Sequence, residues 1–182
     1  MELIRSERDG DAAAVRRVHE TAFPTTAEAD LVERLRAGGK AVIALVAEDA
    51  GSIVGHILFS PVALEPLAGT VGLGLAPVAV LPDHEKHGVG RRLIQNGLAE
   101  CHAWGAGFVV VIGDPPYYGR FGFEAAEKHG LRSEYDAGGS FMVFELVSGA
   151  LPPSGTLVKY APEFAASAKP PGRKKKDAGK NR

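Results

Sequence analysis

Apolar residues recur at three- and four-residue spacing near the start of the chain, which is the period of an amphipathic helix. The positions concerned are Ala12, Val15, Val18 and Ala22. A short strand over residues 1–5 precedes this helix, and the segment "ADLVERLRAGG" predicts a second helix that ends at Gly38 and Gly39. The beginning of the chain is therefore expected to form a strand followed by two helices.

Three apolar segments typical of strands follow, with no helical pattern between them. They cover residues 41–48, 52–64 and 69–81, and the short connections "DAG" and "EPLA" suit antiparallel neighbours. Pro77 interrupts the third segment, and proline has no N–H to donate to a sheet. We therefore expect a bulge at Pro77, or a separation from one neighbouring strand that leaves backbone groups free to pair with a ligand.

The next segment predicts a helix over residues 88–104, followed by a continuous apolar strand over residues 107–113. A strand that is apolar throughout is covered on both faces and is reached by a crossover connection. A parallel βαβ unit inside an otherwise antiparallel sheet is therefore predicted. With a turn or short helix at "DPPYYGRFGF" and a late strand over residues 139–147, the fold class is mixed α/β (α+β), one mostly antiparallel sheet covered by helices.

Length and composition favour one domain with a sizeable core, since 45% of the 182 residues are hydrophobic. No stretch approaches the roughly 18 apolar residues of a membrane span, and the charged N-terminus lacks the apolar core of a secretory signal. We expect a cytoplasmic protein with no membrane partner. The single cysteine, Cys101, falls in the predicted helix and is interpreted as a small core residue.

The net charge of −1 conceals an asymmetry between the body of the chain and its end. Residues 169–182 hold seven Lys or Arg and one Asp, so residues 1–168 carry about −7. A Pro-, Gly- and Lys-rich segment without apolar periodicity buries too little surface to fold. We predict one folded domain over residues 1–168 and a disordered basic tail over residues 169–182. Nucleic acid is expected as a partner only through weak, salt-sensitive attraction to this tail.

The polar segment "PDHEKHGVGRRL", residues 82–93, separates the third strand from the helix over residues 88–104. Unpaired N–H groups at a helix start attract anions, and glycines let a phosphate oxygen approach them, although a plain turn explains the same glycines. A Rossmann fingerprint and a Walker loop are both incomplete here. No metal site is expected from His84 and His87, because two histidines three residues apart in a loop need further ligands.

Two motifs resemble those of the GNAT N-acetyltransferase superfamily. The first, "APVAVLPDHEKHGVGRRLI", is similar to the family's acetyl-CoA motif Q/R-x-x-G-x-G/A, with Glu85 in place of the usual Gln or Arg. The second, "YGRFGF" at residues 118–123, places a tyrosine four residues before Gly-Phe, and its "GDPPYYGRFGF" form resembles one predicted-acetyltransferase branch. The resemblance covers residues 1–147. It implies a GNAT-type sheet splayed at the acetyl-CoA site, with acetyl-CoA as co-substrate and no metal.

The resemblance also implies which residues form the site. The expected cofactor-binding residues are Val78, Ala79, Val80, Lys86, His87, Gly88, Val89, Gly90 and Arg91. Tyr118 is the expected catalytic residue, because a phenol with a pKa of about 10 stays protonated at pH 7 and can protonate the departing thiolate. Tyr117 is interpreted as a pocket wall or packing residue. A backbone N–H near Val80 would stabilise the developing negative oxygen.

Several alternatives stay open at this point. The general base is undecided among Glu48, His56 and Glu65, each of which also has an ordinary surface or core interpretation. Lys86, His87, Arg91 and Arg92 would offset the charge of Glu85 near a pyrophosphate.

The leading hypothesis is an acetyl-CoA-dependent N-acetyltransferase whose acceptor is a small-molecule or peptide amine. The alternative is a non-catalytic acetyl-CoA or CoA sensor or scaffold, supported by Glu85 and by the lack of an Asn after the strand over residues 107–113. A homodimer is among the assemblies left open.

Overall fold

The computed structural model describes residues 2–166, so the predicted basic tail lies outside the described residues. Within them, the strands form a seven-stranded sheet and a smaller three-stranded sheet. The large sheet contains, in spatial order, β1 (Leu3–Ser6), β2 (Ile43–Asp49), β3 (Ser52–Pro61), β5 (Gly72–Val80), β6 (Phe108–Ile112), β9 (Phe141–Glu145) and β7 (Glu124–Ala125). Only β5 and β6 pair in parallel in this sheet, which confirms the mostly antiparallel arrangement.

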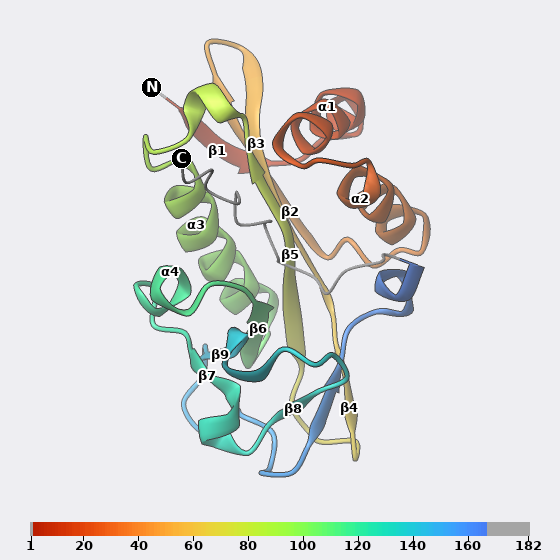
Figure 1. Ribbon diagram of the computed structural model, residues 1–182, viewed down its shortest axis with the longest axis vertical. Coiled ribbons are helices and arrows are strands. Elements are labelled where there is room, and N and C mark those ends of the chain that lie inside the picture. The colour runs from red at the N-terminus through yellow and green to blue at the C-terminus, as the bar shows by residue number, and fades with distance from the viewer. Residues whose placement is uncertain (1, 167–182) are drawn as a thin grey trace, which may run out of the picture.

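Helices cover both faces of the large sheet (Figure 1). The α-helices are α1 (Ala12–Ala22), α2 (Ala27–Ala37), α3 (Val89–Trp104) and α4 (Pro115–Gly119). Short 3₁₀ helices occupy η1 (Asp9–Asp11), η2 (Pro82–His84), η3 (Ala126–His129), η4 (Gly138–Ser140) and η5 (Pro162–Ala166). Helices α1 and α2 lie on one side of the sheet and α3 lies on the other. The protein therefore has the layered α/β architecture that its periodicity predicts.

Two apolar cores result, one on each side of the sheet. Val15 and Val18, on the predicted apolar face of α1, are fully buried in the core on the α1 side. Leu93, Ile94 and Cys101 of α3 are buried in the core on the α3 side. Burial raises the pKa of the Cys101 thiol to about 12, in keeping with its interpretation as a core residue.

The predicted βαβ unit is confirmed, because β5 continues through α3 into its parallel neighbour β6. The predicted bulge is also present. Two residues of β5, Ala76 and Pro77, lie opposite the single residue Leu58 of β3, between regular pairs on either side. The chain therefore accommodates a proline in a central strand by breaking the register there.

The structure corrects the extent of one predicted strand. Residues 52–64 form β3, which ends at Pro61, and a separate strand β4 (Ala63–Glu65). Strand β4 belongs to the small sheet, where it pairs with β10 (Leu157–Lys159), which in turn pairs with β8 (Arg132–Ser133). Residues 63–65 leave the large sheet because their partner is the late strand β10 rather than β5. In the described part, no helix combines the length and the apolar character that crossing a membrane requires.

Candidate active site

Strands β5 and β6 pair over a short stretch and then separate. Their pairs are Gly72–Phe108, Leu73–Val109 and Gly74–Val110. Beyond Gly74, β5 continues to Val80 and remains paired with β3 on its other edge. One edge of β5 is thus left without a strand partner among the described residues. We refer to the space beyond Gly74 as the β5–β6 gap.

Backbone groups of β5 face this gap in an alternating pattern. The N–H of Leu81, directly after β5, donates to the carbonyl of Val54 in β3 at 2.8 Å. Successive residues of a strand point their backbone groups to opposite edges, so the groups of Ala79 also face β3. The groups of Val78 and Val80 therefore face the gap. Of the three strand residues expected to bind a cofactor, two have free backbone groups there, and Ala79 instead places its side chain in the core on the α1 side.

The glycine-containing loop ends at the start of α3. Gly88 is the residue before the helix and has a φ of 79°, in the left-handed region that favours glycine. The first helical hydrogen bond runs from the N–H of Arg92 to the carbonyl of Gly88 at 3.0 Å. The N–H groups of Val89, Gly90 and Arg91 come before it and have no carbonyl to bond within the helix. The loop thus presents three N–H groups and the positive end of a 16-residue helix.

Cationic side chains surround this helix start. Lys86, His87 and Arg91 are exposed, and one guanidinium nitrogen of Arg91 lies 4.0 Å from where a Cβ on Gly88 would be. Arg92, by contrast, donates to the carbonyl of His87 at 3.3 Å and forms an ion pair with Glu2, so it ties the loop to the N-terminus. Glu85, the residue that departs from the family motif, is exposed.

Tyr118 is held by close packing at the end of β6. It lies on α4, is 5% exposed, and makes an edge-to-face contact with Phe123 at 5.6 Å. Its ring covers Gly113 so closely that a Cβ there would lie 2.2 Å from the Cε2 atom of Tyr118. Burial raises the pKa of the Tyr118 hydroxyl, and the neighbouring Tyr117 adds to the shift. The hydroxyl therefore stays protonated at neutral pH and can act as a proton donor.

Tyr117 links α4 to the start of α3. Its hydroxyl oxygen lies 3.1 Å from where a Cβ on Gly90 would be. Its ring meets the ring of Tyr118 edge to face at 5.1 Å, and the Arg120 guanidinium lies 5.7 Å from the ring centroid. Tyr117 is half-buried and lies against both Tyr118 and the start of α3, and its role as a pocket wall or packing residue stays a prediction.

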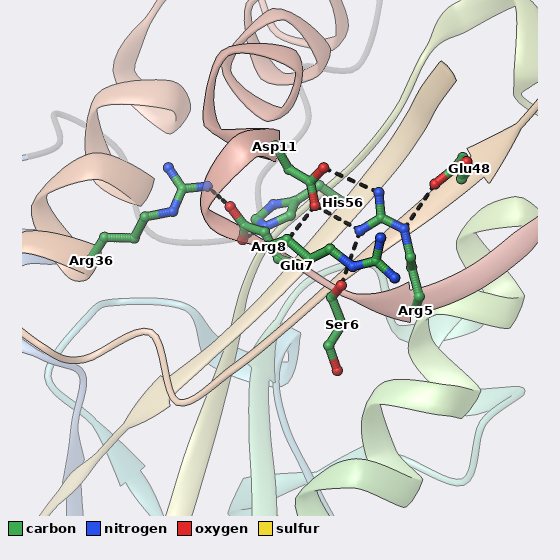
Figure 2. Close-up of polar contacts among 8 residues, drawn as sticks. All are labelled: Arg5, Ser6, Glu7, Arg8, Asp11, Arg36, Glu48 and His56. Carbon is green, nitrogen blue, oxygen red and sulfur yellow. Dashed lines mark hydrogen bonds and ion pairs between the residues drawn. The ribbon is translucent and has the colours of Figure 1, made fainter. Parts of the chain in front are cut away.

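Two of the three base candidates lie away from the gap in ion pairs. Glu48 accepts a hydrogen bond from Arg5 at 2.8 Å, and β3 separates its strand from β5 (Figure 2). Glu65 pairs with Lys159 at 2.7 Å in the small sheet. The third candidate, His56, lies opposite Ala79 on the strand next to β5.

His56 belongs to a buried polar chain on the α1 side of the sheet. Its Nε2 lies 2.9 Å from one carboxylate oxygen of Glu7, and the other oxygen of Glu7 pairs with Arg36 of α2 (Figure 2). Its Nδ1 lies 2.8 Å from Nε2 of His19 in α1. Because a carboxylate only accepts, His56 donates through Nε2 and accepts from His19 through Nδ1. Burial lowers the pKa of both histidines, which are therefore neutral near pH 7.

Two buried polar residues near the strands of the gap, His19 and Tyr160, were not predicted from the sequence. His19 follows Val15 by four residues, so the helical period already placed it on the buried face of α1. Tyr160, just after β10, is 3% exposed and lies against Gly74, the last residue of β5 that pairs with β6. No local pattern marks Tyr160, because its position depends on the C-terminal segment returning to β4.

The described residues contain no group of three or more His, Cys, Asp or Glu side chains placed to hold a metal ion. His84 lies in η2 and His87 in the loop that follows, and no third potential ligand joins them within residues 2–166. The groups that the site offers are backbone N–H groups, phenols and cationic side chains.

Known proteins resemble this chain in sequence and in fold. The acetyltransferase (GNAT) domain family matches residues 3–126. The uncharacterized N-acetyltransferase YhbS of Escherichia coli K12 is 37% identical over 164 residues, which are 89% of this chain and 98% of YhbS. The crystal structure of E. coli YhbS in complex with CoA aligns with a TM-score of 0.84 at 36% identity, covering 90% of this chain and 92% of YhbS.

A GNAT family acetyltransferase from Brucella melitensis, crystallised in complex with acetyl-CoA, aligns with a TM-score of 0.75 at 35% identity. The alignment covers 90% of this chain and 98% of that protein. The family match spans most of the described residues, and these relatives cover nearly the whole fold. On this evidence, the chain belongs to the GNAT family of acetyltransferases.

Proposed function

We propose that the protein is an N-acetyltransferase that moves the acetyl group of acetyl-CoA to a primary amine by direct attack in a ternary complex. The proposal rests on the combination of three features in one protein: the β5–β6 gap, the glycine at the start of α3, and the buried Tyr118 at the end of β6. The CoA and acetyl-CoA complexes of the two relatives support acetyl-CoA as the donor.

The residues present fit a phosphate-bearing thioester. The N–H groups of Val89, Gly90 and Arg91 would bind the pyrophosphate, with Lys86 and Arg91 adding positive charge. Glycine is needed at position 90, because a Cβ would crowd Tyr117 and occupy the approach to these N–H groups. The pantetheine arm would pair with the backbone of Val78 and Val80, which places the thioester toward the bulge at Pro77.

Three groups then have distinct tasks. The amine must first lose a proton, since a lysine-like acceptor has a pKa of about 10.4. As its nitrogen bonds to the carbonyl carbon, the gap-facing N–H of Val78, next to the bulge, would stabilise the negative charge that develops on oxygen. As the carbon–sulfur bond breaks, Tyr118 would donate its proton to the departing sulfur, and the proton that the attacking nitrogen loses on forming the amide would restore the neutral phenol. The raised pKa of Tyr118 ensures that this proton is available at neutral pH.

The direct test is an assay of the purified protein with acetyl-CoA and a panel of primary amines, reading free CoA with a thiol reagent. The panel contains spermidine, tyramine, kanamycin, Nα-acetyl-lysine methyl ester and an alanine-initiated peptide. We expect CoA release that depends on one or more of these amines, with the acetylated amine detected by mass spectrometry. Binding of acetyl-CoA without acetylation of any panel amine would contradict the proposal.

That same outcome would support the second hypothesis, a sensor or scaffold that binds acetyl-CoA without transferring its acetyl group. Glu85 is the residue that favours this hypothesis, because it places a carboxylate where the family motif has Gln or Arg. Glu85 is exposed at the loop surface, and the cationic Lys86, His87 and Arg91 lie close to it in the sequence, which favours the enzyme. The cytoplasmic location, a homodimer and the role of the basic tail stay predictions.

A further inference from the structure

Tyr160 carries a buried hydroxyl with no hydrogen-bond partner among residues 2–166. Its backbone N–H is satisfied by Glu134 at 2.9 Å, and its ring packs against Phe164 at 5.0 Å and Tyr135 at 6.1 Å. A phenylalanine would make the same ring contacts, and an unpaired buried hydroxyl is unfavourable. The hydroxyl therefore has no evident part in holding the fold together.

The position of Tyr160 suggests what this hydroxyl serves. A Cβ on Gly74 would lie 2.6 Å from the Cε1 atom and 2.9 Å from the Cδ1 atom of Tyr160, so the ring covers the residue at which β5 and β6 separate. Ser60 lies opposite Gly74 on β3, is fully buried, and also has a hydroxyl without a partner in the described part. Two unpaired hydroxyls thus lie at the closed end of the β5–β6 gap.

Tyr160 and Tyr118 approach the gap from opposite sides of the sheet. Tyr118 packs in the core on the α3 side, whereas Tyr160 packs in the core on the α1 side. Burial raises the pKa of Tyr160 well above its ordinary value, and Tyr118 and Tyr135 raise it further. The Tyr160 hydroxyl is therefore neutral and can both donate and accept a hydrogen bond.

We propose that the Tyr160 hydroxyl contacts the acceptor amine, accepting a hydrogen bond from the neutral amine and directing its lone pair toward the thioester carbonyl. This inference rests on the proposed function. In that reaction Tyr118 donates a proton to the sulfur, and the N–H of Val78 stabilises the carbonyl oxygen. The attacking nitrogen is the reacting atom that still requires a partner. Tyr160 meets this requirement from the side opposite α3, whose start would hold the pyrophosphate.

The test compares Tyr160→Phe with the matched control Tyr135→Phe, which removes a hydroxyl from the adjacent ring. The probe amine is the panel member that the wild type acetylates fastest. We expect Tyr160→Phe to melt at or above the wild-type temperature, because an unpaired buried hydroxyl is removed. We expect its Kd for acetyl-CoA to stay within about twofold and its kcat/KM for the amine to fall about tenfold, the effect of one lost hydrogen bond. Tyr135→Phe should change kcat/KM by less than about threefold.

Wild-type kcat/KM in Tyr160→Phe would overturn the inference and leave the proposed function standing. A Kd for acetyl-CoA weakened about tenfold would overturn it as well, because the hydroxyl would then serve the donor. A wild type that acetylates no panel amine contradicts the proposed function and this inference together.

Should Tyr160→Phe melt below the wild type, 3-fluorotyrosine at position 160 provides a second measurement. Its fluorine resonance should shift on adding the amine to the CoA-bound protein. An unchanged resonance at saturating amine would overturn the inference.

Discussion

His19 and His56 meet ring to ring in the core between α1 and the sheet, with His19 Nε2 2.8 Å from His56 Nδ1. Both side chains are fully buried. The carboxyl of Glu7 bonds to His56 on the side away from His19. Burial alone would raise the pKa of Glu7, but the interactions with His56 and Arg36 outweigh burial and lower it. The folded protein therefore holds an ionised carboxylate next to two neutral histidines.

This arrangement predicts that stability falls in mild acid. Burial lowers the pKa of both histidines, so below about pH 6.5 the unfolded chain binds protons that the folded protein does not. Their contribution is fully present above pH 6.5 and declines as the pH drops, by up to about 2.7 kcal/mol per pH unit for two protons. Urea unfolding at pH 7.5, 6.5 and 5.5 measures this slope.

His19→Leu should make the slope shallower, since one of the two protons is removed. The control His102→Gln changes an exposed histidine at the end of α3 and should leave the slope as it is. An unfolding free energy that stays constant between pH 7.5 and 5.5 in the wild type would contradict the neutral state assigned to the two histidines.

Tyr118→Phe should lower kcat with the panel amine by about 100-fold, the lower end of what a general acid contributes. The ring contacts with Phe123 and Gly113 do not involve the hydroxyl, so the fold and the Kd for acetyl-CoA should change little. Steady-state kinetics and calorimetric titration with acetyl-CoA measure the two quantities. A variant with wild-type kcat would remove Tyr118 from the role of acid.

Gly113→Ala tests the placement of Tyr118 without changing the tyrosine. The added methyl group would lie 2.2 Å from Cε2 of Tyr118, so the ring must move. We expect a loss of about 1–3 kcal/mol in stability from overpacking and a fall in kcat of about 100-fold from misplacement of the hydroxyl. Gly69→Ala, where no atom crowds the added methyl and the backbone is outside the left-handed region, is the control for glycine replacement and should keep the wild-type kcat. Equal kcat values for the two variants would mean that the position of Tyr118 is unimportant.

Gly90→Ala should weaken acetyl-CoA binding about tenfold, because the methyl group would stand in front of the N–H groups at the start of α3. The same methyl group would lie 3.1 Å from the Tyr117 hydroxyl. This close contact should also lower the stability of Gly90→Ala. Adding Tyr117→Phe removes the hydroxyl and should therefore restore stability but leave acetyl-CoA binding weak. Thermal unfolding and calorimetry separate these effects. Recovery of affinity in the double variant would show that Gly90 serves only to accommodate Tyr117.

Local patterns predicted most of the large sheet and its helices. Periodicity located α1, α2 and α3, and the apolar run over residues 107–113 correctly predicted a covered strand next to β5. Pro77 correctly indicated the bulge, because a missing N–H has the same consequence in any central strand. The small sheet was missed, since β4, β8 and β10 are only two or three residues long, too short to show an alternation.

The candidate site likewise contains residues that the sequence predicted and contacts that it did not predict. The glycine start of α3 and Tyr118 lie in continuous motifs, so they were found as strings of residues. His19 and His56 are 37 positions apart, and Tyr160 meets Gly74 only because the C-terminal segment returns to β4. The residues that flank these positions form no local pattern that would predict either contact.

By itself, the sequence determined the order of strands and helices, the break at Pro77 and the glycine-containing start of α3, because these depend on hydrophobic period and on the backbone chemistry of proline and glycine. Only the tertiary structure decided which edge of β5 is left unpaired, that Ala79 turns its backbone away from the gap, and that Tyr160 lies at its closed end. Those features arise from strand pairing and side-chain packing between distant segments, which no local pattern specifies.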